Sequence, residues 1–320
     1  MSSVTVIGAG AWGTALAIQA ARAGNAVTLW ARDPARAGII AASRENPRLS
    51  GVRLPEPIAV TSTLSGGGEA TLLAVPMQHL RGVLARLPIG TAPLVVCAKG
   101  VEAQTLCLPL EIIEQIQPRA PSAVLTGPNF AHEIAAGLPA AAVVASADAA
   151  VRETVAKLLG TPSFRLYGND DPIGAQVGGA AKNVIAIAAG AVIGAGLGEN
   201  ARAALITRGL AELARLTAAL GGRAETVMGL SGLGDLLLTC TGPASRNCSL
   251  GLAIGRGEAL ADVLAARSTV TEGVATAPAL VARASEVDLP ICTAVAALLA
   301  GRTTLAEAMA ALLARPRRDE

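Results

Sequence analysis

The sequence has few of the residues that most often bind metals or stack on nucleic-acid bases. It contains two histidines, His79 and His132, and five cysteines, which are scattered without CxxC spacing. We therefore expect neither a metal site nor a disulfide framework. Two Phe, two Trp and one Tyr are the only aromatic residues, the net charge is +2, and no run of five basic residues occurs. Nucleic acid is therefore not an expected partner.

Neither a membrane span nor a cleavable leader is expected. The most apolar stretch, residues 184–198, falls short of the roughly 20 apolar residues that cross a bilayer, contains four glycines and directly follows Lys182 and Asn183. The first ten residues lack the basic segment of a signal peptide and begin a strand pattern at once. The sequence therefore predicts a cytoplasmic protein without stable membrane insertion, in which residues 184–198 lie in a buried helix.

Lysine is also rare: of 26 basic residues, only Lys99, Lys157 and Lys182 are lysine. Lysine can give up a proton, whereas arginine cannot. Lys182 lies early in a strongly apolar helical pattern, where a charge needs a partner or a chemical role. Because reduction of a ketone by hydride also requires a proton, we predict Lys182 to be the proton donor. Lys99 ends a predicted strand, where α/β sheets bind ligands, and Lys157 is predicted to be a surface helix residue.

The pattern of the chain changes near residue 170. Before it, short apolar runs alternate with helical patterns, which predicts βαβ units and a parallel sheet covered by helices. Strands are expected at 4–7, 26–30, 70–75, 94–98, 122–125 and 140–145, and helices near 12–22, 34–44, 76–86, 106–116 and 148–159. After it, only helices are expected, beginning at 174–195 and 201–219. The predicted domains are therefore residues 1–170, an α/β domain, and 171–320, an all-helical domain.

The first predicted strand leads directly into a glycine-rich loop. Gly8, Gly10 and Gly13 form a GxGxxG pattern between this strand and a helix, the order typical of a Rossmann-type dinucleotide site. Gly8 permits the tight turn, Gly10 lets the backbone approach a pyrophosphate, and Gly13 lets helix and strand pack closely. Trp12, within the loop, either packs on the helix face or covers the cofactor. The sequence thus predicts an NAD(P)-binding Rossmann domain.

The end of the second predicted strand carries signals for both nicotinamide cofactors. Arg32 suits the 2′-phosphate of NADP, and Asp33 suits the ribose hydroxyls of NAD. Asp33 could instead cap the helix that begins at Pro34, and this interpretation is slightly favoured. Because Arg32 comes first, NADPH, or use of both cofactors, is slightly favoured over NADH alone.

A second group of polar residues follows in the helical half. Arg246 has the fork geometry that suits a phosphate, with Ser245 and Asn247 as neutral donors. Asp235 could orient Lys182 or bind a hydroxyl. From the residues alone, Asp235 and Arg246 could equally form a structural ion pair.

Taken in order, these blocks resemble the bacterial NAD(P)-dependent glycerol-3-phosphate dehydrogenases over almost the full chain. The resemblance is carried by 8–13 (GAGAWG), 98–100 (AKG), 126–131 (TGPNFA), 179–186 (GAAKNVIA), 232–235 (GLGD) and 245–247 (SRN). The Ala-Lys-Asn-Val and Gly-Leu-Gly-Asp blocks are more specific than the glycine-rich loop. Two positions depart from the commonest pattern: Ala11, where many members have serine, and Asn129, where many have threonine.

The resemblance implies a reaction and a set of residues. It implies reversible hydride transfer between NAD(P)H and dihydroxyacetone phosphate, giving sn-glycerol 3-phosphate for phospholipid biosynthesis, in a cleft between the two domains. Lys182 would be catalytic. Substrate contacts would come from Lys99, Gly127, Asn129, Asp235, Ser245, Arg246 and Asn247. Cofactor contacts would come from Gly8, Gly10, Ala11, Trp12, Gly13, Arg32, Lys99, Ala131, Arg246, Val270 and Glu272. The resemblance also suggests a homodimer.

Two other functions remain open from the sequence. A ketopantoate or hydroxyacid reductase has a similar build but little use for residues grouped around a phosphate. A nucleotide-sensing protein without turnover would not need Lys182 and Asp235.

Overall fold

The computed structural model describes residues 1–242, 244–267 and 270–316, and the chain divides into two compact units. Unit 1 comprises Met1–Lys99 and Cys107–Gln176, and unit 2 comprises Gly100–Leu106 and Val177–Glu320. The sequence boundary placed at residue 170 stays a prediction.

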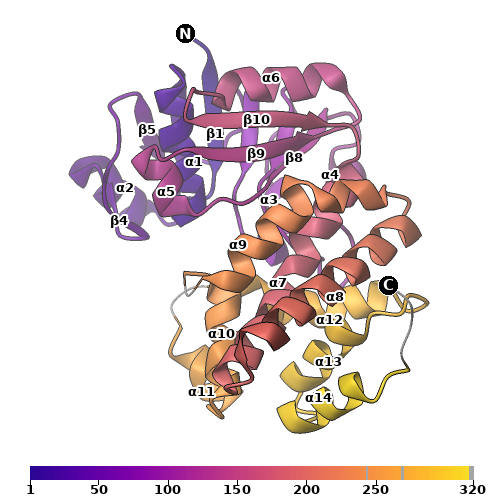
Figure 1. The fold of residues 1–320 in the computed structure, drawn as a ribbon. Helices are drawn as coiled ribbons and strands as arrows, with labels where there is room; N and C mark the ends of the chain where they lie inside the picture. Colours follow the sequence, from indigo (N-terminus) through magenta and orange to yellow (C-terminus); the bar gives the residue numbers. More distant parts are fainter. Residues whose placement is uncertain (243, 268–269, 317–320) are drawn as a thin grey trace. The chain divides into compact units, whose positions relative to one another are not determined.

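Unit 1 is built around an eight-stranded sheet with the order β10-β9-β8-β7-β6-β1-β2-β5 (Figure 1). Its strands are β1 (Ser3–Ile7), β2 (Ala26–Trp30), β5 (Ile58–Thr61), β6 (Ala70–Leu73), β7 (Leu94–Val96), β8 (Ser122–Thr126), β9 (Ala140–Ala145) and β10 (Phe164–Asn169). Apolar side chains of β1 and β6, such as Val6 and Leu72, are fully buried. Because β1 runs parallel to β2 and to β6, the carboxyl ends of these strands meet at one edge.

Helices accompany the strands of unit 1, as the alternating pattern predicted. They are α1 (Ala11–Arg22), α2 (Pro34–Ser43), η1 (Met77–His79), α3 (Leu80–Leu84), α4 (Pro109–Ile116), α5 (Ala131–Ala136) and α6 (Ala149–Leu159). A small antiparallel hairpin, β3 (Glu45–Asn46) and β4 (Leu49–Arg53), follows α2. The fold class of unit 1 is confirmed, although β5, β10, α5 and this hairpin were not predicted.

One strand pair departs from the expected parallel sheet. β8 and β9 pair in antiparallel register, with Leu125 opposite Val144, whereas the other neighbours in the sheet are parallel. The connection between them holds only the six-residue helix α5. Such a helix rises about 9 Å, less than the roughly 17 Å of a five-residue strand, so it does not return the chain to the strand start. β9 therefore runs back along β8.

The described residues of unit 2 form helices and turns, which confirms the helical half. The elements are α7 (Pro172–Gly194, beginning in unit 1), α8 (Gly198–Ala219), η2 (Ala224–Met228), η3 (Leu230–Gly234), α9 (Asp235–Thr241), α10 (Arg246–Gly255), α11 (Leu260–Ala265), α12 (Glu272–Arg283), α13 (Pro290–Leu299) and α14 (Leu305–Leu313).

The helix α7 is long and apolar enough to cross a membrane, but 83% of its most apolar window is buried inside the protein. The prediction of a buried helix over residues 184–198 is confirmed up to Gly194, where the helix ends, whereas residues 195–198 lie outside it and are exposed. Its glycines explain how it packs: a Cβ on Gly190 would lie 2.0 Å from the Cys248 oxygen, and a Cβ on Gly251 would lie 1.9 Å from the Ile187 oxygen. The backbones of α7 and α10 therefore touch, which places the start of α10 beside the middle of α7.

Candidate active site

The glycine-rich loop (Gly8–Gly13) of unit 1 depends on the absence of side chains at two positions. Gly8 has φ +117°, and a Cβ there would lie 2.7 Å from the Ala74 oxygen. A Cβ on Gly13 would lie 1.9 Å from the Gly8 oxygen. Because real Cβ atoms do not approach oxygen this closely, only glycine allows α1 to start where β1 ends.

Gly10 differs from these two, because a Cβ there would meet no atom within 4 Å. It is exposed and is the N-cap of α1, and no side chain caps the helix. The amino end of a helix attracts anions through its unpaired N–H groups and its dipole. The open space over Gly10 and the uncapped helix together fit the pyrophosphate of a dinucleotide.

Four residues considered for cofactor binding lie within this loop or after β2, and their surroundings differ. Ala11 and Trp12 begin α1, and both are half-buried against the apolar core of unit 1. Asp33 is the N-cap of α2, and its Oδ1 accepts a hydrogen bond of 2.9 Å from the Ala35 N–H. The capping interpretation of Asp33 is therefore confirmed. Arg32, two positions after the end of β2, is exposed.

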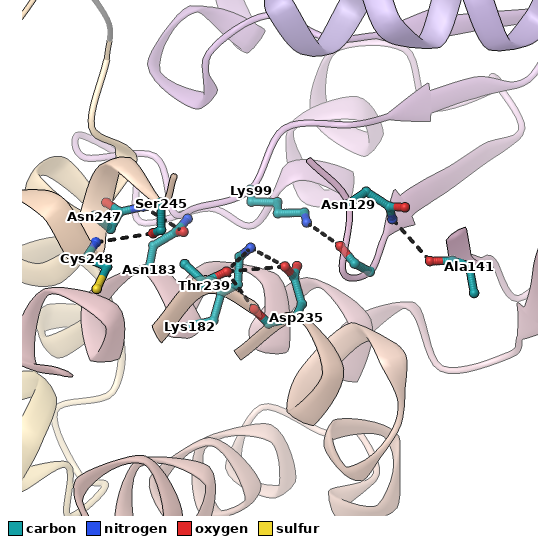
Figure 2. Close-up of polar contacts among 11 residues, drawn as sticks. Lys99, Asn129, Ala141, Lys182, Asn183, Asp235, Thr239, Ser245, Asn247 and Cys248 are labelled. Atoms are coloured by element: carbon teal, nitrogen blue, oxygen red, sulfur yellow. Dashed lines mark hydrogen bonds and ion pairs between the residues drawn. The ribbon is translucent and has the colours of Figure 1, made fainter. Parts of the chain in front are cut away.

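A second group of predicted residues lies after β7 and β8 in unit 1. Lys99 Nζ donates to the Gly127 oxygen over 3.1 Å, and Asn129 Nδ2 donates to the Ala141 oxygen over 3.2 Å (Figure 2). Gly127 has φ +129°, and a Cβ there would lie 3.3 Å from Asn129 Nδ2. Among the described residues, Asn129 Oδ1 is buried and makes no hydrogen bond. Because buried polar atoms are normally paired, this oxygen suits a ligand's donor. Ala131 begins α5 just beyond.

Lys182 lies in α7 of unit 2 and is buried, with 7% of its surface exposed. Its Nζ forms an ion pair with Oδ1 of Asp235, which is 1% exposed, and donates to Thr239 Oγ1 over 2.9 Å. Thr239 in turn donates to the Asp235 backbone oxygen over 2.6 Å. Figure 2 shows the three side chains turned toward one another. The structure therefore pairs Asp235 with Lys182, one of the arrangements that the sequence left open.

The backbone around Asp235 explains how it reaches Lys182. The preceding element, η3, is a single turn of π-helix, a distortion that is common at functional sites. A Cβ on Gly178 of α7 would lie 2.6 Å from the Ser231 oxygen of η3. This close approach brings the start of α9 against α7, so that Asp235 lies opposite Lys182.

The residues predicted to bind phosphate surround the start of α10. Ser245 is its N-cap, and its Oγ accepts from the Cys248 N–H. Asn247 Nδ2 donates to Asn183 Oδ1 over 2.9 Å, and Asn247 Oδ1 accepts from the Gly273 N–H over 3.0 Å. Arg246 is exposed, and its Nη1 donates to the Val270 oxygen over 2.8 Å. Glu272, the first residue of α12, adjoins Gly273.

Comparison with known proteins assigns the family. The family model described as NAD-dependent glycerol-3-phosphate dehydrogenase N-terminus matches residues 3–152, and the model described as the C-terminus of the same enzyme matches residues 171–310. The chain belongs to the NAD-dependent glycerol-3-phosphate dehydrogenase family. The resemblance seen in the sequence is thereby confirmed.

Relatives of this family match nearly the whole chain. It is 61% identical over 317 residues to a glycerol-3-phosphate dehydrogenase [NAD(P)+] of Acidiphilium cryptum, covering 98% of this chain and 97% of the relative. The protein of the same description from Gluconobacter oxydans is 52% identical, with coverages of 98% and 97%. The crystal structure of glycerol-3-phosphate dehydrogenase from Coxiella burnetii aligns with a TM-score of 0.94 at 35% identity, covering 98% of this chain and 99% of that one.

Two residues that contact the predicted site residues were missed by the sequence interpretation. Thr239 contacts both Lys182 and Asp235. Its spacing of four residues from Asp235 places both side chains on one face of α9, a signal that was available in the sequence. Asn183, beside Lys182, contacts Asn247, and this contact depends on the packing of α7 against α10, which the sequence does not display.

Proposed function

We propose that this chain is a glycerol-3-phosphate dehydrogenase that interconverts dihydroxyacetone phosphate and sn-glycerol 3-phosphate with NAD(P)H. The proposal depends on one observation above all: a buried lysine that is paired with a buried carboxylate and a hydroxyl, in a member of this family. An oxidoreductase acting on a CH–OH group needs a side chain that transfers a proton at the carbonyl oxygen.

Lys182 is the proton donor in ketone reduction and the acceptor in alcohol oxidation. Asp235 and Thr239 hold its Nζ at one place, which limits the positions from which the proton can be delivered. As the C2 oxygen of the substrate gains negative charge, Nζ passes it a proton. The bound nicotinamide supplies the hydride to C2 in this direction.

The phosphate of the substrate is assigned to the start of α10. Arg246 brings a guanidinium suited to two phosphate oxygens, and Ser245 and Asn247 flank it on the same turn. We further assign substrate contacts to Lys99, Gly127, Asn129 and Asp235. The buried Asn129 Oδ1 supports its assignment, because it offers an acceptor to a substrate hydroxyl.

The cofactor is assigned to the glycine-rich loop and its neighbours. Contacts come from Gly8, Gly10, Ala11, Trp12, Gly13, Arg32, Lys99, Ala131, Arg246, Val270 and Glu272. Because the Asp33 carboxylate is engaged as a helix cap while Arg32 is exposed, we favour NADPH slightly over NADH. We also propose that the protein is cytoplasmic, forms a homodimer and has no nucleic-acid partner. Its proposed role is in phospholipid biosynthesis.

The proposal is tested by following NADPH or NADH oxidation with dihydroxyacetone phosphate, with ketopantoate and a 2-keto acid as comparison substrates. We expect turnover with the triose phosphate only. Turnover with ketopantoate alone would replace the proposal with a ketopantoate reductase. Cofactor binding without turnover of any of these substrates would favour a nucleotide-sensing protein.

A further inference from the structure

The hairpin that follows α2 places a buried asparagine against the glycine-rich loop. Arg44, the last residue before β3, has φ +58° and donates through Nη1 to the Ile58 oxygen over 2.8 Å, which holds the start of the hairpin to the sheet. Asn46 then enters unit 1 with only 1% of its surface exposed. Burying an amide costs free energy unless its N–H groups and its oxygen form hydrogen bonds. The hydrogen-bond partners of Asn46 therefore indicate its role.

Both ends of the Asn46 side chain are paired. Its Nδ2 donates to the Ala9 oxygen over 3.1 Å and to Thr14 Oγ1 over 2.7 Å. Its Oδ1 accepts from the Arg48 N–H over 3.1 Å and from Arg36 Nη2 over 3.2 Å. Arg36 Nη2 also donates to the Ala9 oxygen over 3.2 Å. The amide thus joins the hairpin and α2 to the loop.

The next carbonyl of the loop is held by the same group of residues. Thr14 donates to the Gly10 oxygen through Oγ1 over 2.8 Å and through its backbone N–H over 3.0 Å. In a trans peptide, the carbonyl of one residue and the N–H of the next point in opposite directions. Holding the Ala9 and Gly10 oxygens on the protein side therefore turns the N–H groups of Gly10 and Ala11 the other way, toward the open space over Gly10.

We propose that Asn46 is a positioning residue for the cofactor, which fixes the peptides of the glycine-rich loop so that the N–H groups of Gly10 and Ala11 face the pyrophosphate. The inference rests on the proposed function only in requiring a nicotinamide dinucleotide as the ligand. It adds the hairpin of residues 45–53 to the cofactor-binding machinery.

The charges around Asn46 agree with an anionic ligand at this place. Desolvation lowers the pKa of Arg36, and the positive charge of Arg48 lowers it further, while Asp33 acts in the opposite direction. A nearby anion would offset the repulsion between the two guanidinium groups.

The test compares Asn46 with Asn25, a matched asparagine in the same unit. Asn25 is 3% exposed, and its Nδ2 donates to the Ala20 and Leu158 oxygens, each over 2.7 Å, away from the glycine-rich loop. Dissociation constants for NADH, NADPH, ADP-ribose and adenosine are measured by calorimetry on the full chain, without substrate. Asn46→Ala should weaken NADH, NADPH and ADP-ribose equally, by about tenfold. Adenosine binding and all affinities of Asn25→Ala should remain unchanged.

Asn46→Asp separates the donors from the acceptor. The aspartate keeps an oxygen for Arg36 and the Arg48 N–H but has no N–H for the Ala9 oxygen, so it should weaken the pyrophosphate-bearing ligands at least as much as alanine does. If Asn46→Ala does not fold, Thr14→Val provides the second measurement, because it removes the hydroxyl from the Gly10 oxygen at nearly constant volume. Unchanged affinity for ADP-ribose in the folded variants would overturn the proposal, as would a loss confined to NADPH. Because binding is read directly, a chain that does not turn over dihydroxyacetone phosphate can still confirm the positioning role.

Discussion

The glycine-rich loop of unit 1 and the Lys182 cluster of unit 2 are built by opposite means. The loop presents backbone, and its constraints are the missing Cβ atoms of Gly8 and Gly13. The cluster presents side chains, and its constraints are the particular atoms of Lys182, Asp235 and Thr239. Backbone N–H groups suffice to bind a pyrophosphate, whereas proton transfer needs one ionisable atom at a fixed place. The loop should therefore tolerate a different side chain, such as the alanine at position 11, whereas the cluster should not tolerate changes at its three positions.

The largest effect should follow from removing the ammonium of the cluster. Lys182→Ala should lower kcat by at least about a hundredfold, because it removes the proposed proton donor. The dissociation constant for NADPH should stay unchanged, since the loop lies outside the mutated cluster. Lys157→Ala, which removes an exposed lysine on α6, is the matched control and should leave both quantities unaltered. Near-normal turnover of Lys182→Ala would remove the catalytic role.

Two alanine substitutions test which glycines of the loop are needed for folding and which for cofactor binding. Gly13→Ala would place a Cβ 1.9 Å from the Gly8 oxygen, so it should lower the melting temperature and abolish cofactor binding together. Gly10→Ala meets no atom within 4 Å and should melt like the wild type, but its methyl group would occupy the open space and raise the Kd for NADPH by about tenfold. Thermal melts and calorimetry on both variants measure the two effects. Normal cofactor affinity in Gly10→Ala would mean that the pyrophosphate lies elsewhere.

Much of the loop and of the cluster could be predicted from the sequence, because each is marked by a local pattern along the chain. β1 and α1 are adjacent in the chain, so the order of strand, glycines and helix is visible as a local pattern. The buried helix around Lys182 was predictable from its apolar run, and the rarity of lysine singled out that residue. In both places the signal lies within about 20 consecutive residues, the range over which periodicity is informative.

The features that were missed depend on contacts between distant segments. Asn46 is separated from the Ala9 carbonyl by 37 positions, and Asn183 is separated from Asn247 by 64. The reversal of β9 against β8 depends on a helix too short to carry the chain back, and its strand pattern alone does not reveal direction. Pairing and direction are properties of packing, which a single sequence displays only indirectly.

A smaller effect is expected at the edge of the Lys182 cluster. Thr239→Val keeps the shape of the side chain but removes the oxygen that accepts from Lys182 Nζ. Turnover should fall by about tenfold, the cost of one misplaced hydrogen bond, with cofactor affinity unchanged. Thr239→Ser retains the hydroxyl and should therefore keep most of the wild-type activity. Equal kcat values for the valine and serine variants would assign Thr239 to packing.

The smallest effect is expected for substitution of Arg32. It tests whether a side chain near the glycine-rich loop contributes to cofactor binding. Arg32 is exposed, so its attraction to a 2′-phosphate is weakened by water and by salt. Arg32→Ala should raise the KM for NADPH by about threefold to tenfold while changing that for NADH little, which corresponds to about 1 kcal/mol of lost binding. The difference should shrink as ionic strength increases. Equal changes in the two KM values would show that Arg32 does not contact the 2′-phosphate, and cofactor choice would then depend on other groups beside the loop, with Arg36 the first to examine.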